Sequence, residues 1–217
     1  MNDLVRASEL LKEFKGESLR KRVSRLEGAL AAKDGVSLES FLAREHIGRE
    51  LLAAALLVKH ASSQINEIVH ALGIVLALPS ILADNERVES LSLAAGNTGK
   101  GFDVETSRRV AEFTFIEWQG GPEVMRQNKV FKDFYFLAEA DTSKRKELYA
   151  VGTSHVLAFL NSGRAIPQIL KGNAKLGNSF RERYGGQFAV VRDYYQTKKG
   201  VVRIKDIRTH LALLRQI

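Results

Sequence analysis

The sequence contains no cysteine and only three prolines among its 217 residues. Without cysteine the chain can form neither disulfides nor a thiolate zinc site. No G-x-S-x-G segment is present, so the sharp turn that carries a hydrolase serine is not expected. The five histidines lack the HExxH spacing of zinc enzymes, and we expect them to be packing or surface residues: His46, His60, His70, His155 and His210.

Long apolar runs are also missing. The strongest are residues 51–58 and 71–83, the second of which contains Pro79. Both are shorter than the roughly 18 residues that a membrane-spanning helix requires. The start, MNDLVRASELLKEFKG, lacks the apolar segment of a secretory signal. These features predict a cytoplasmic protein without a membrane partner.

The charge of the chain is unevenly distributed. The formal net charge is +8, with +2 on residues 1–60, −5 on residues 61–125 and +11 on residues 126–217. Clustered lysine and arginine favour an anionic partner such as nucleic acid, because they neutralise phosphates and release counterions. A moderately basic protein without such a partner is the alternative, and charge alone does not separate the two.

The first part of the chain has the periodicity of helices, at residues 4–14, 19–33, 37–42 and 47–60. The segment SSQINEIVHALGIVLALPSIL predicts a further helix, which Pro79 should end. We therefore expect a helical N-terminal region, residues 1–60, packed on a core of residues 61–217 that ends in a basic C-terminal region.

After this helix the sequence alternates as strands do. The segments VESLSLAA, GFDVET and RRVAEFTFIEW predict a three-stranded meander. A helix should begin near Pro122, with Asp133 on its polar side, and residues 146–153 should form a fourth strand followed by a helix at 154–160. Further strands are expected at 188–195 and 201–204, and a helix at 207–214. The predicted class is α/β, with the order α-β-β-β-α-β in the core.

The segment GFDVETSRRVAEFTF, residues 101–115, carries the candidate chemistry. Alternation places Phe102 and Val104 on one face and Asp103 and Glu105 on the other. If the strands pair across the turn at residues 107–108, Asp103 and Glu112 lie near one another. Carboxylates held together repel unless a cation or a shared proton lies between them, and Mg²⁺ is the expected cation. The alternative is a solvated polar face, which is how we interpret Glu105.

Asp103 and the segment Glu112-Phe113-Thr114 resemble the motif of the PD-(D/E)XK, or restriction-endonuclease-like, nucleases. The resemblance covers roughly residues 62–160 and implies an α-β-β-β-α-β core that binds Mg²⁺ or Mn²⁺. It further implies site residues in three groups: Asp103, Glu112, Thr114 and Lys129 in catalysis; Glu67, Asp103 and Glu112 as metal ligands; Gln119, Arg126, Gln127 and Lys132 in contact with DNA.

Thr114 departs from this motif, because a lysine is expected there and threonine cannot act as a base near neutral pH. Lys129 or Lys132 could replace it, metals alone could suffice, the site could be inactive, or the threonine could be engineered. The expected function is a metal-dependent endonuclease acting on DNA. The alternative is an inactive protein of the same fold that binds nucleic acid or a protein partner, and a third is a helical partner-binding protein with an incidental hairpin. A homodimer is left open.

Basic residues near Tyr184, Tyr194 and Tyr195 suggest a second way to hold nucleic acid, with the rings stacking on bases. Tyrosines in strands are more often half-buried packing residues, which is the alternative interpretation.

Overall fold

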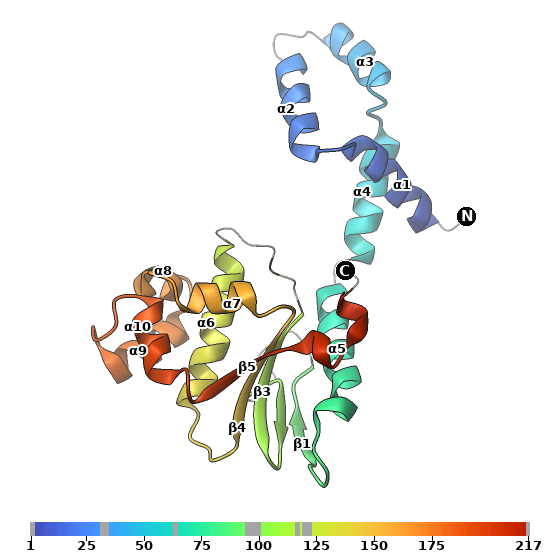
Figure 1. Cartoon of the computed structure of the whole chain (residues 1–217). Coiled ribbons are helices and arrows are strands. Elements are labelled where there is room, and N and C mark those ends of the chain that lie inside the picture. The colour runs from blue at the N-terminus through green and yellow to red at the C-terminus, as the bar shows by residue number, and fades with distance from the viewer. Residues whose placement is uncertain are drawn as a thin grey trace. The chain divides into compact units, whose positions relative to one another are not determined.

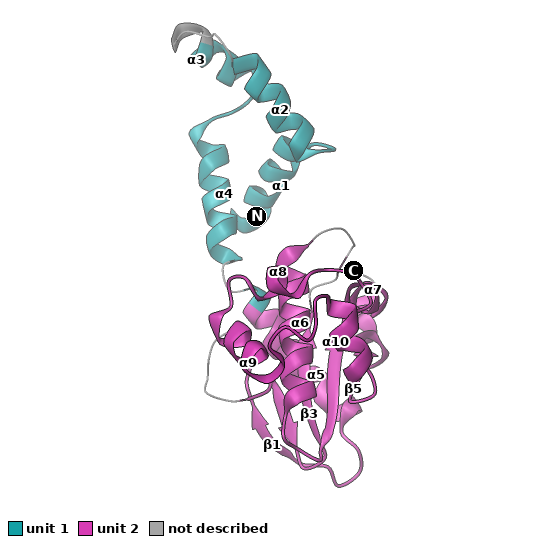
Figure 2. Cartoon of the chain, turned by 90° about the vertical axis from the view of Figure 1, so that its left-hand side faces the viewer, with its two compact units in different colours: residues 1–66 teal, residues 67–217 magenta. Residues whose placement is uncertain are grey.

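The computed structural model describes residues 3–30, 35–62, 65–93, 101–115, 118 and 123–215. Figure 1 shows its elements, and Figure 2 shows the two compact units into which the chain divides, residues 1–66 and 67–217. The predicted packing of the helical region on the core stays a prediction.

The first unit is helical, as predicted. Its helices are α1 (Asp3–Lys15), α2 (Leu19–Leu30), α3 (Gly35–Arg44) and α4 (Arg49–Ala61). Helix α1 packs along α4, and Glu45 forms ion pairs with Arg22 at 2.8 Å and Arg25 at 2.7 Å. Among the described residues of this unit, the buried apolar side chains are few and mostly small: Ala7, Leu26, Phe41 and Ala54.

The second unit contains five strands: β1 (Val88–Leu91), β2 (Val104–Thr106), β3 (Arg109–Thr114), β4 (Arg145–Ala150) and β5 (Val202–Asp206). Its helices are α5 (Ile65–Ile81), α6 (Val124–Glu139), α7 (Ser154–Leu160), α8 (Ile166–Leu170), α9 (Ala174–Tyr184) and α10 (Val191–Lys198), followed by the 3-10 helices η1 (Ile207–Thr209) and η2 (Ala212–Arg215).

All five strands form one mixed sheet in the order β1-β2-β3-β4-β5. Strands β1, β2 and β3 pair antiparallel as the predicted meander. Helix α6 then connects β3 to β4, which pairs parallel to β3, and β5 pairs parallel to β4. The predicted α/β class is confirmed, and α5, β1, β2, β3, α6 and β4 follow in the predicted order.

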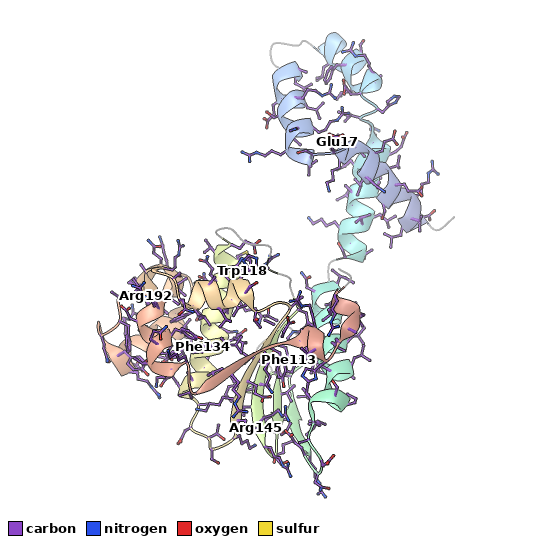
Figure 3. All side chains as sticks on the ribbon, in the orientation of Figure 1. Glu17, Phe113, Trp118, Phe134, Arg145 and Arg192 are labelled. Atoms are coloured by element: carbon purple, nitrogen blue, oxygen red, sulfur yellow. The ribbon has the colours of Figure 1, made fainter. Side chains whose placement is uncertain are left out.

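The sheet separates two hydrophobic clusters, because its side chains alternate between its two faces. On one face α6 and the C-terminal helices pack around Phe131, Phe134 and Tyr194. On the other face α5 packs its buried residues on Phe113 and Tyr149. Helix α5 lies on one side of the sheet and α6 on the other (Figure 1), and Figure 3 labels Phe113 and Phe134 as members of the two clusters.

Three local predictions are wrong. Residues 191–198 form helix α10, where a strand was expected at 188–195, because Val191, Tyr194 and Tyr195 bury a helical stripe against α6. The C-terminal segment forms two short 3-10 helices in place of one helix. Helix α5 continues past Pro79 to Ile81, since a proline in the last turn removes only one hydrogen bond near the end of the helix.

One segment is long and apolar enough to cross a membrane by length and composition alone. It covers residues 49–81, which include α4 and α5, with a mean hydropathy of 1.4 in its most apolar window. Ile74, Ala77 and Ile81 are buried against the sheet, while Ile68, Leu72 and Leu76 are exposed on the outer face of α5. The absence of a membrane partner therefore stays a prediction.

Candidate functional site

Asp103 and Glu112 are brought together at the hairpin of β2 and β3. Asp103 lies in a bend immediately before β2, and its Oδ2 accepts a 2.8 Å hydrogen bond from the backbone N–H of Phe113. This bond ties the bend to β3, next to Glu112, and the Asp103 carboxylate lies close enough to Glu112 to raise its pKa. A pair of carboxyl groups therefore lies at one place on the sheet, as the alternation of residues predicted.

The bend also changes which way the neighbouring residues point. Phe102 packs in the cluster around α6, whereas Val104 packs in the cluster beneath α5. The prediction that these two side chains share a face is therefore wrong, because residues 101–103 are bent and not extended. Glu105 turns away from the site and binds Lys144 Nζ through Oε1 at 2.8 Å, as expected of an outer charge.

Helix α6 contributes a lysine and a third carboxylate. Lys129 Nζ donates to Asp133 Oδ2 at 2.5 Å and to the backbone carbonyl of Phe113 at 3.3 Å. This carbonyl belongs to the residue between Glu112 and Thr114, so the ammonium group reaches β3 beside the position where the lysine of the motif is expected. Asp133 is only 1% exposed, although its position on the polar side of the predicted helix suggested a surface residue.

Helix α5 contributes His70, which was expected to be a packing or surface residue. Its Nε2 lies 3.4 Å from Asp103 Oδ1, and its ring packs edge to face on Phe115. Gly73 permits this contact, because a Cβ atom there would lie 2.4 Å from the ring of Phe115. Glu67, the expected third metal ligand, lies one turn before His70 and is partly buried.

The surroundings shift the pKa values of Glu112 and Asp103 in opposite directions. Burial, together with repulsion by Asp133 and Asp103, raises the pKa of Glu112 to about 10. Burial alone would raise the pKa of Asp103, but His70, the backbone N–H of Phe113 and the charge of Lys129 together outweigh this effect and lower it overall. Burial lowers the pKa of Lys129, and the nearby Asp133 carboxylate more than reverses this, so that the pKa of the ammonium group is raised.

The residues expected to contact DNA are only partly gathered at the site. Arg126 forms an ion pair with Glu123 one turn earlier, and Gln127 is partly buried on α6. Lys132 Nζ lies 3.4 Å from Asp133 Oδ1 while its side chain remains 42% exposed. Gln119 lies outside the described residues.

The expected base-stacking tyrosines are packing residues. Tyr194 is fully buried, Tyr195 is 8% exposed, and both pack on Phe134. The hydroxyls of Tyr184 and Tyr194 donate to Glu139 at 2.6 and 2.8 Å. The packing interpretation is confirmed for Tyr194 and Tyr195, although on a helix and not on a strand.

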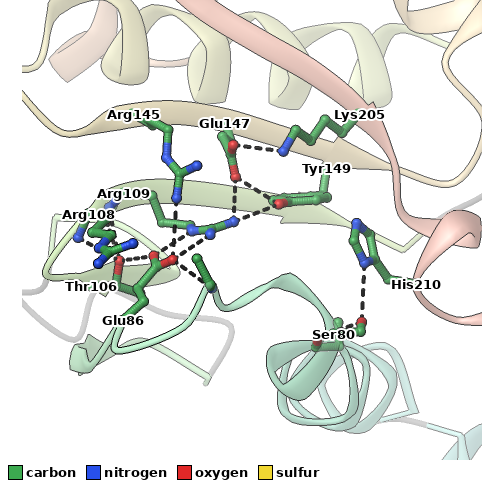
Figure 4. A network of polar contacts seen from close by, with 12 residues as sticks. Ser80, Glu86, Thr106, Arg108, Arg109, Arg145, Glu147, Tyr149, Lys205 and His210 are labelled. Carbon is green, nitrogen blue, oxygen red and sulfur yellow. Dashed lines mark hydrogen bonds and ion pairs between the residues drawn. The ribbon is translucent and has the colours of Figure 1, made fainter.

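A second polar cluster lies on the face of the sheet that α5 covers, and Figure 4 shows it. Arg109 donates to Glu86 through Nη2 at 2.5 Å and Nε at 2.6 Å, and to Glu147 through Nη1 at 2.9 Å. Tyr149 and Lys205 complete the partners of Glu147. Each buried charge here has an opposite partner, which is typical of a structural ion-pair network.

The Asp103–Glu112 pair differs from this network because its carboxyl groups outnumber the cations. In the part of the chain that the structure describes, no three His, Asp or Glu side chains form a group that could hold a metal ion. Fold and site together define a mixed α/β protein with two neighbouring carboxyl groups and a lysine beside the same strand. Comparison of the chain with protein-family models, with curated proteins and with solved structures finds no match.

Proposed function

We propose that this protein is a metal-dependent endonuclease of the restriction-endonuclease-like type, which hydrolyses phosphodiester bonds of DNA. The observation that carries the proposal is that Asp103 lies beside Glu112 on the hairpin, with Lys129 Nζ beside the same strand. Phosphodiester hydrolysis requires ligands for a metal ion, which the two carboxyl groups would supply. It also requires a positive charge beside the phosphate, which Lys129 would supply. The order of α5, the meander, α6 and β4 agrees with this proposal.

Asp103 and Glu112 would hold Mg²⁺ or Mn²⁺. The residues fit such an ion, because two adjoining carboxyl groups, one with a strongly raised pKa, gain a counter-charge when a divalent cation binds. Mg²⁺ is commonly bound by one or two carboxylates with substrate phosphate and water completing its shell, so three protein ligands are not required. When bound, the ion would lower the pKa of water and stabilise the leaving oxygen.

Lys129 would take the role of the motif lysine, because Thr114 occupies the position where that lysine is expected. Its ammonium group reaches the backbone of β3 from α6 and is held there by Asp133. Lys132 also contacts Asp133, but at 3.4 Å and with a more exposed side chain. Lys129 is therefore the better placed of the two lysines.

The basic C-terminal part of the chain supports a nucleic acid as the substrate, and the resemblance to restriction-endonuclease-like nucleases implies that it is DNA. Residues 126–217 carry a net charge of +11, and exposed lysines and arginines lie on α9, α10, β5 and the loops around them: Lys171, Lys175, Arg181, Arg183, Arg192, Lys199 and Arg203. Arg192 is labelled in Figure 3. Such residues would bind the phosphate backbone without reading its sequence.

Cleavage of supercoiled plasmid in the presence of Mg²⁺ tests the proposal. We expect nicked plasmid from the wild-type protein and a loss of about 100-fold or more in Asp103→Asn and in Glu112→Gln, the size of effect seen when a key electrostatic group is removed. Glu105→Gln is the matched control, because Glu105 lies on the same hairpin and binds Lys144 outside the site. Equal cleavage by all four proteins would reject the assignment.

The second candidate is a protein of the same fold that binds nucleic acid without cutting it. Thr114 favours this function, since the lysine of the motif is absent from its strand. It predicts retarded but intact plasmid in the same assay, in wild type and Asp103→Asn alike.

A further inference from the structure

Helix α6, which carries Lys129, also carries a buried carboxylate, Asp133. Asp133 is 1% exposed and lies among the apolar residues that α6 packs on the sheet. Burial of a carboxylate is unfavourable unless a partner compensates its charge. Its partner is Lys129, one helical turn earlier, with Nζ 2.5 Å from Asp133 Oδ2.

The position of Lys129 makes this pair more than a helix-stabilising contact. An exposed i,i+4 pair lies on the solvent side of its helix, whereas Lys129 Nζ also donates to the Phe113 carbonyl on β3. Asp133 therefore holds one end of a lysine whose other contact is the strand that carries Glu112. Lys132, which lies 3.4 Å from the other oxygen of Asp133, has no comparable contact with β3 among the hydrogen bonds of the described residues.

We infer that Asp133 is a positioning residue, which holds Lys129 as a fixed cation beside the Asp103–Glu112 pair, and that Lys129 serves there to bind the phosphate charge and not to accept a proton. This inference rests on the proposed nuclease function. It adds to that function the separate roles of Asp133 and Lys129.

The charges around Lys129 support this role. Lys129 Nζ donates both to the Asp133 carboxylate and to the Phe113 carbonyl, and these two acceptors favour its charged form. A proton acceptor needs a free lone pair and a pKa near the ambient pH, and an ammonium group held by two acceptors suits neither requirement. A permanent ammonium group suits a phosphoryl oxygen, where charge accumulates during displacement.

The reaction balances without a proton on Lys129 being exchanged. The oxygen of water forms a bond to phosphorus, and the bond from phosphorus to the leaving sugar oxygen breaks. The proton that the attacking water loses passes to solvent water, and the leaving oxygen takes a proton from solvent. The ammonium group of Lys129 remains charged throughout and compensates the phosphate.

Substitution of Lys129 distinguishes the role of a fixed cation from that of a proton acceptor. Arginine keeps the charge but cannot act as a base, whereas glutamine loses the charge. We expect Lys129→Arg to cleave plasmid within about 10-fold of wild type and Lys129→Gln to lose about 100-fold or more. Lys144→Gln is the control and should cleave nearly as wild type, because Lys144 lies outside the site, where it binds Glu89 and Glu105. Equal loss in Lys129→Arg and Lys129→Gln would contradict the role of a fixed cation.

The pH dependence of kcat tests Asp133. Because Asp133 favours the charged lysine, Asp133→Asn should move the alkaline loss of activity to lower pH, and this loss should disappear in Asp133→Asn/Lys129→Arg. Asp133→Glu should restore the wild-type profile. If Lys129 were the base, Asp133→Asn would instead raise activity near neutral pH. Circular dichroism spectra that match wild type would show that each variant is folded.

A direct titration distinguishes failure of this inference from failure of the nuclease function. If wild-type protein does not cleave DNA, the catalytic role falls with the proposed function. The positioning role is then decided by NMR of ¹⁵N-labelled lysine, with the Lys129 Nζ signal assigned from its absence in Lys129→Arg. A lower pKa of Lys129 in Asp133→Asn than in wild type supports the contact, and an unchanged pKa overturns it.

Discussion

Individual carboxyl groups in this protein lie in two contrasting environments. Glu86 is buried with Arg109 and Thr106 as hydrogen-bond partners, and its charge is compensated. Glu112 lies beside Asp103 and Asp133, and its charge is opposed. The first arrangement stabilises the fold, whereas the second costs stability at neutral pH, which is common where a site is built for a ligand.

Replacing Glu112 by glutamine should stabilise the metal-free protein above neutral pH. The folded-state pKa of about 10 lies above the ordinary 4.5, so the contribution of Glu112 to stability is most favourable below pH 4.5 and falls progressively as the pH rises towards 10. Glutamine does not ionise, and we expect Glu112→Gln to gain about 1 to 2 kcal/mol at pH 8 and much less at pH 5.

Urea denaturation in the presence of EDTA, at both pH values, measures this difference. Glu105→Gln is again the control and should show no gain that grows with pH. An advantage of Glu112→Gln that is equal at pH 5 and pH 8 would mean that the carboxyl group is not destabilised by its neighbours.

Replacing Glu86 by glutamine should have the opposite effect. Hydrogen bonds from Arg109 lower the pKa of Glu86 to about 2, so its contribution to stability is present above pH 4.5 and is lost as the pH falls from 4.5 towards 2. Glu86→Gln leaves Arg109 with Glu147 as its carboxylate partner and with the Tyr149 hydroxyl (Figure 4), and we expect a loss of about 3 kcal/mol at pH 7. Urea denaturation at pH 3 should show a clearly smaller loss, and equal losses at both pH values would refute this assignment.

At the scale of elements, the docking of α5 on the sheet depends on one glycine. Gly73 lies against Phe115, so that a Cβ atom would clash with the ring at 2.4 Å, whereas a Cβ atom at Gly177 in α9 would meet only ordinary contacts at 3.8 Å. Alanine in place of glycine inside a helix usually adds about 0.5 to 1 kcal/mol. We expect this gain for Gly177→Ala, and a loss of about 1 to 3 kcal/mol for Gly73→Ala because Phe115 must move.

Thermal unfolding of the two variants beside wild type checks this prediction. Since His70 lies on the same helix and contacts Phe115, Gly73→Ala should also shift the NMR signals of the His70 ring, and Gly177→Ala should not. A gain in stability from both substitutions would show that α5 does not approach the sheet as closely as Gly73 permits.

The elements that sequence could predict are those whose pattern is local. Alternation in residues 104–106 and 109–114 is sufficient to identify a hairpin, and the spacing of Phe131, Phe134 and Tyr135 is sufficient to identify α6. Residues 188–195 misled the prediction because valine and tyrosine favour strands, although Val191 and Tyr194 or Tyr195 also match helical spacing. The choice depends on the aromatic cluster around Tyr194, which the local sequence does not contain.

In the candidate site, too, only the residues placed by local sequence could be predicted. Asp103 and Glu112 could be paired from the sequence because both lie on one hairpin, and Lys129 could be proposed because it lies on the following helix. His70 and Asp133 could not be assigned to the site, because their positions depend on how α5 and α6 dock on opposite faces of the sheet. The i,i+4 spacing of Lys129 and Asp133 was the one available signal, and it also fits an ordinary surface pair.

At the scale of the whole molecule, the two units differ in how much core each possesses. Both hydrophobic clusters consist of residues from the second unit, and so do all five strands. The first unit has few buried apolar side chains among its described residues. Burial of apolar surface is the main favourable term in folding and must offset the loss of chain entropy, so the second unit should fold alone and the first should not.

We therefore expect a fragment of residues 65–217, which keeps all of α5, to unfold in one cooperative urea transition and to cleave plasmid if the full chain does. A fragment of residues 1–62 should give a weak helical circular dichroism signal that decreases gradually with temperature, because short helices without a core are marginally stable. Urea and thermal unfolding of both fragments beside the full chain measure this. A gradual transition for residues 65–217 would show instead that the N-terminal helices complete the core on which the Asp103–Glu112 pair depends.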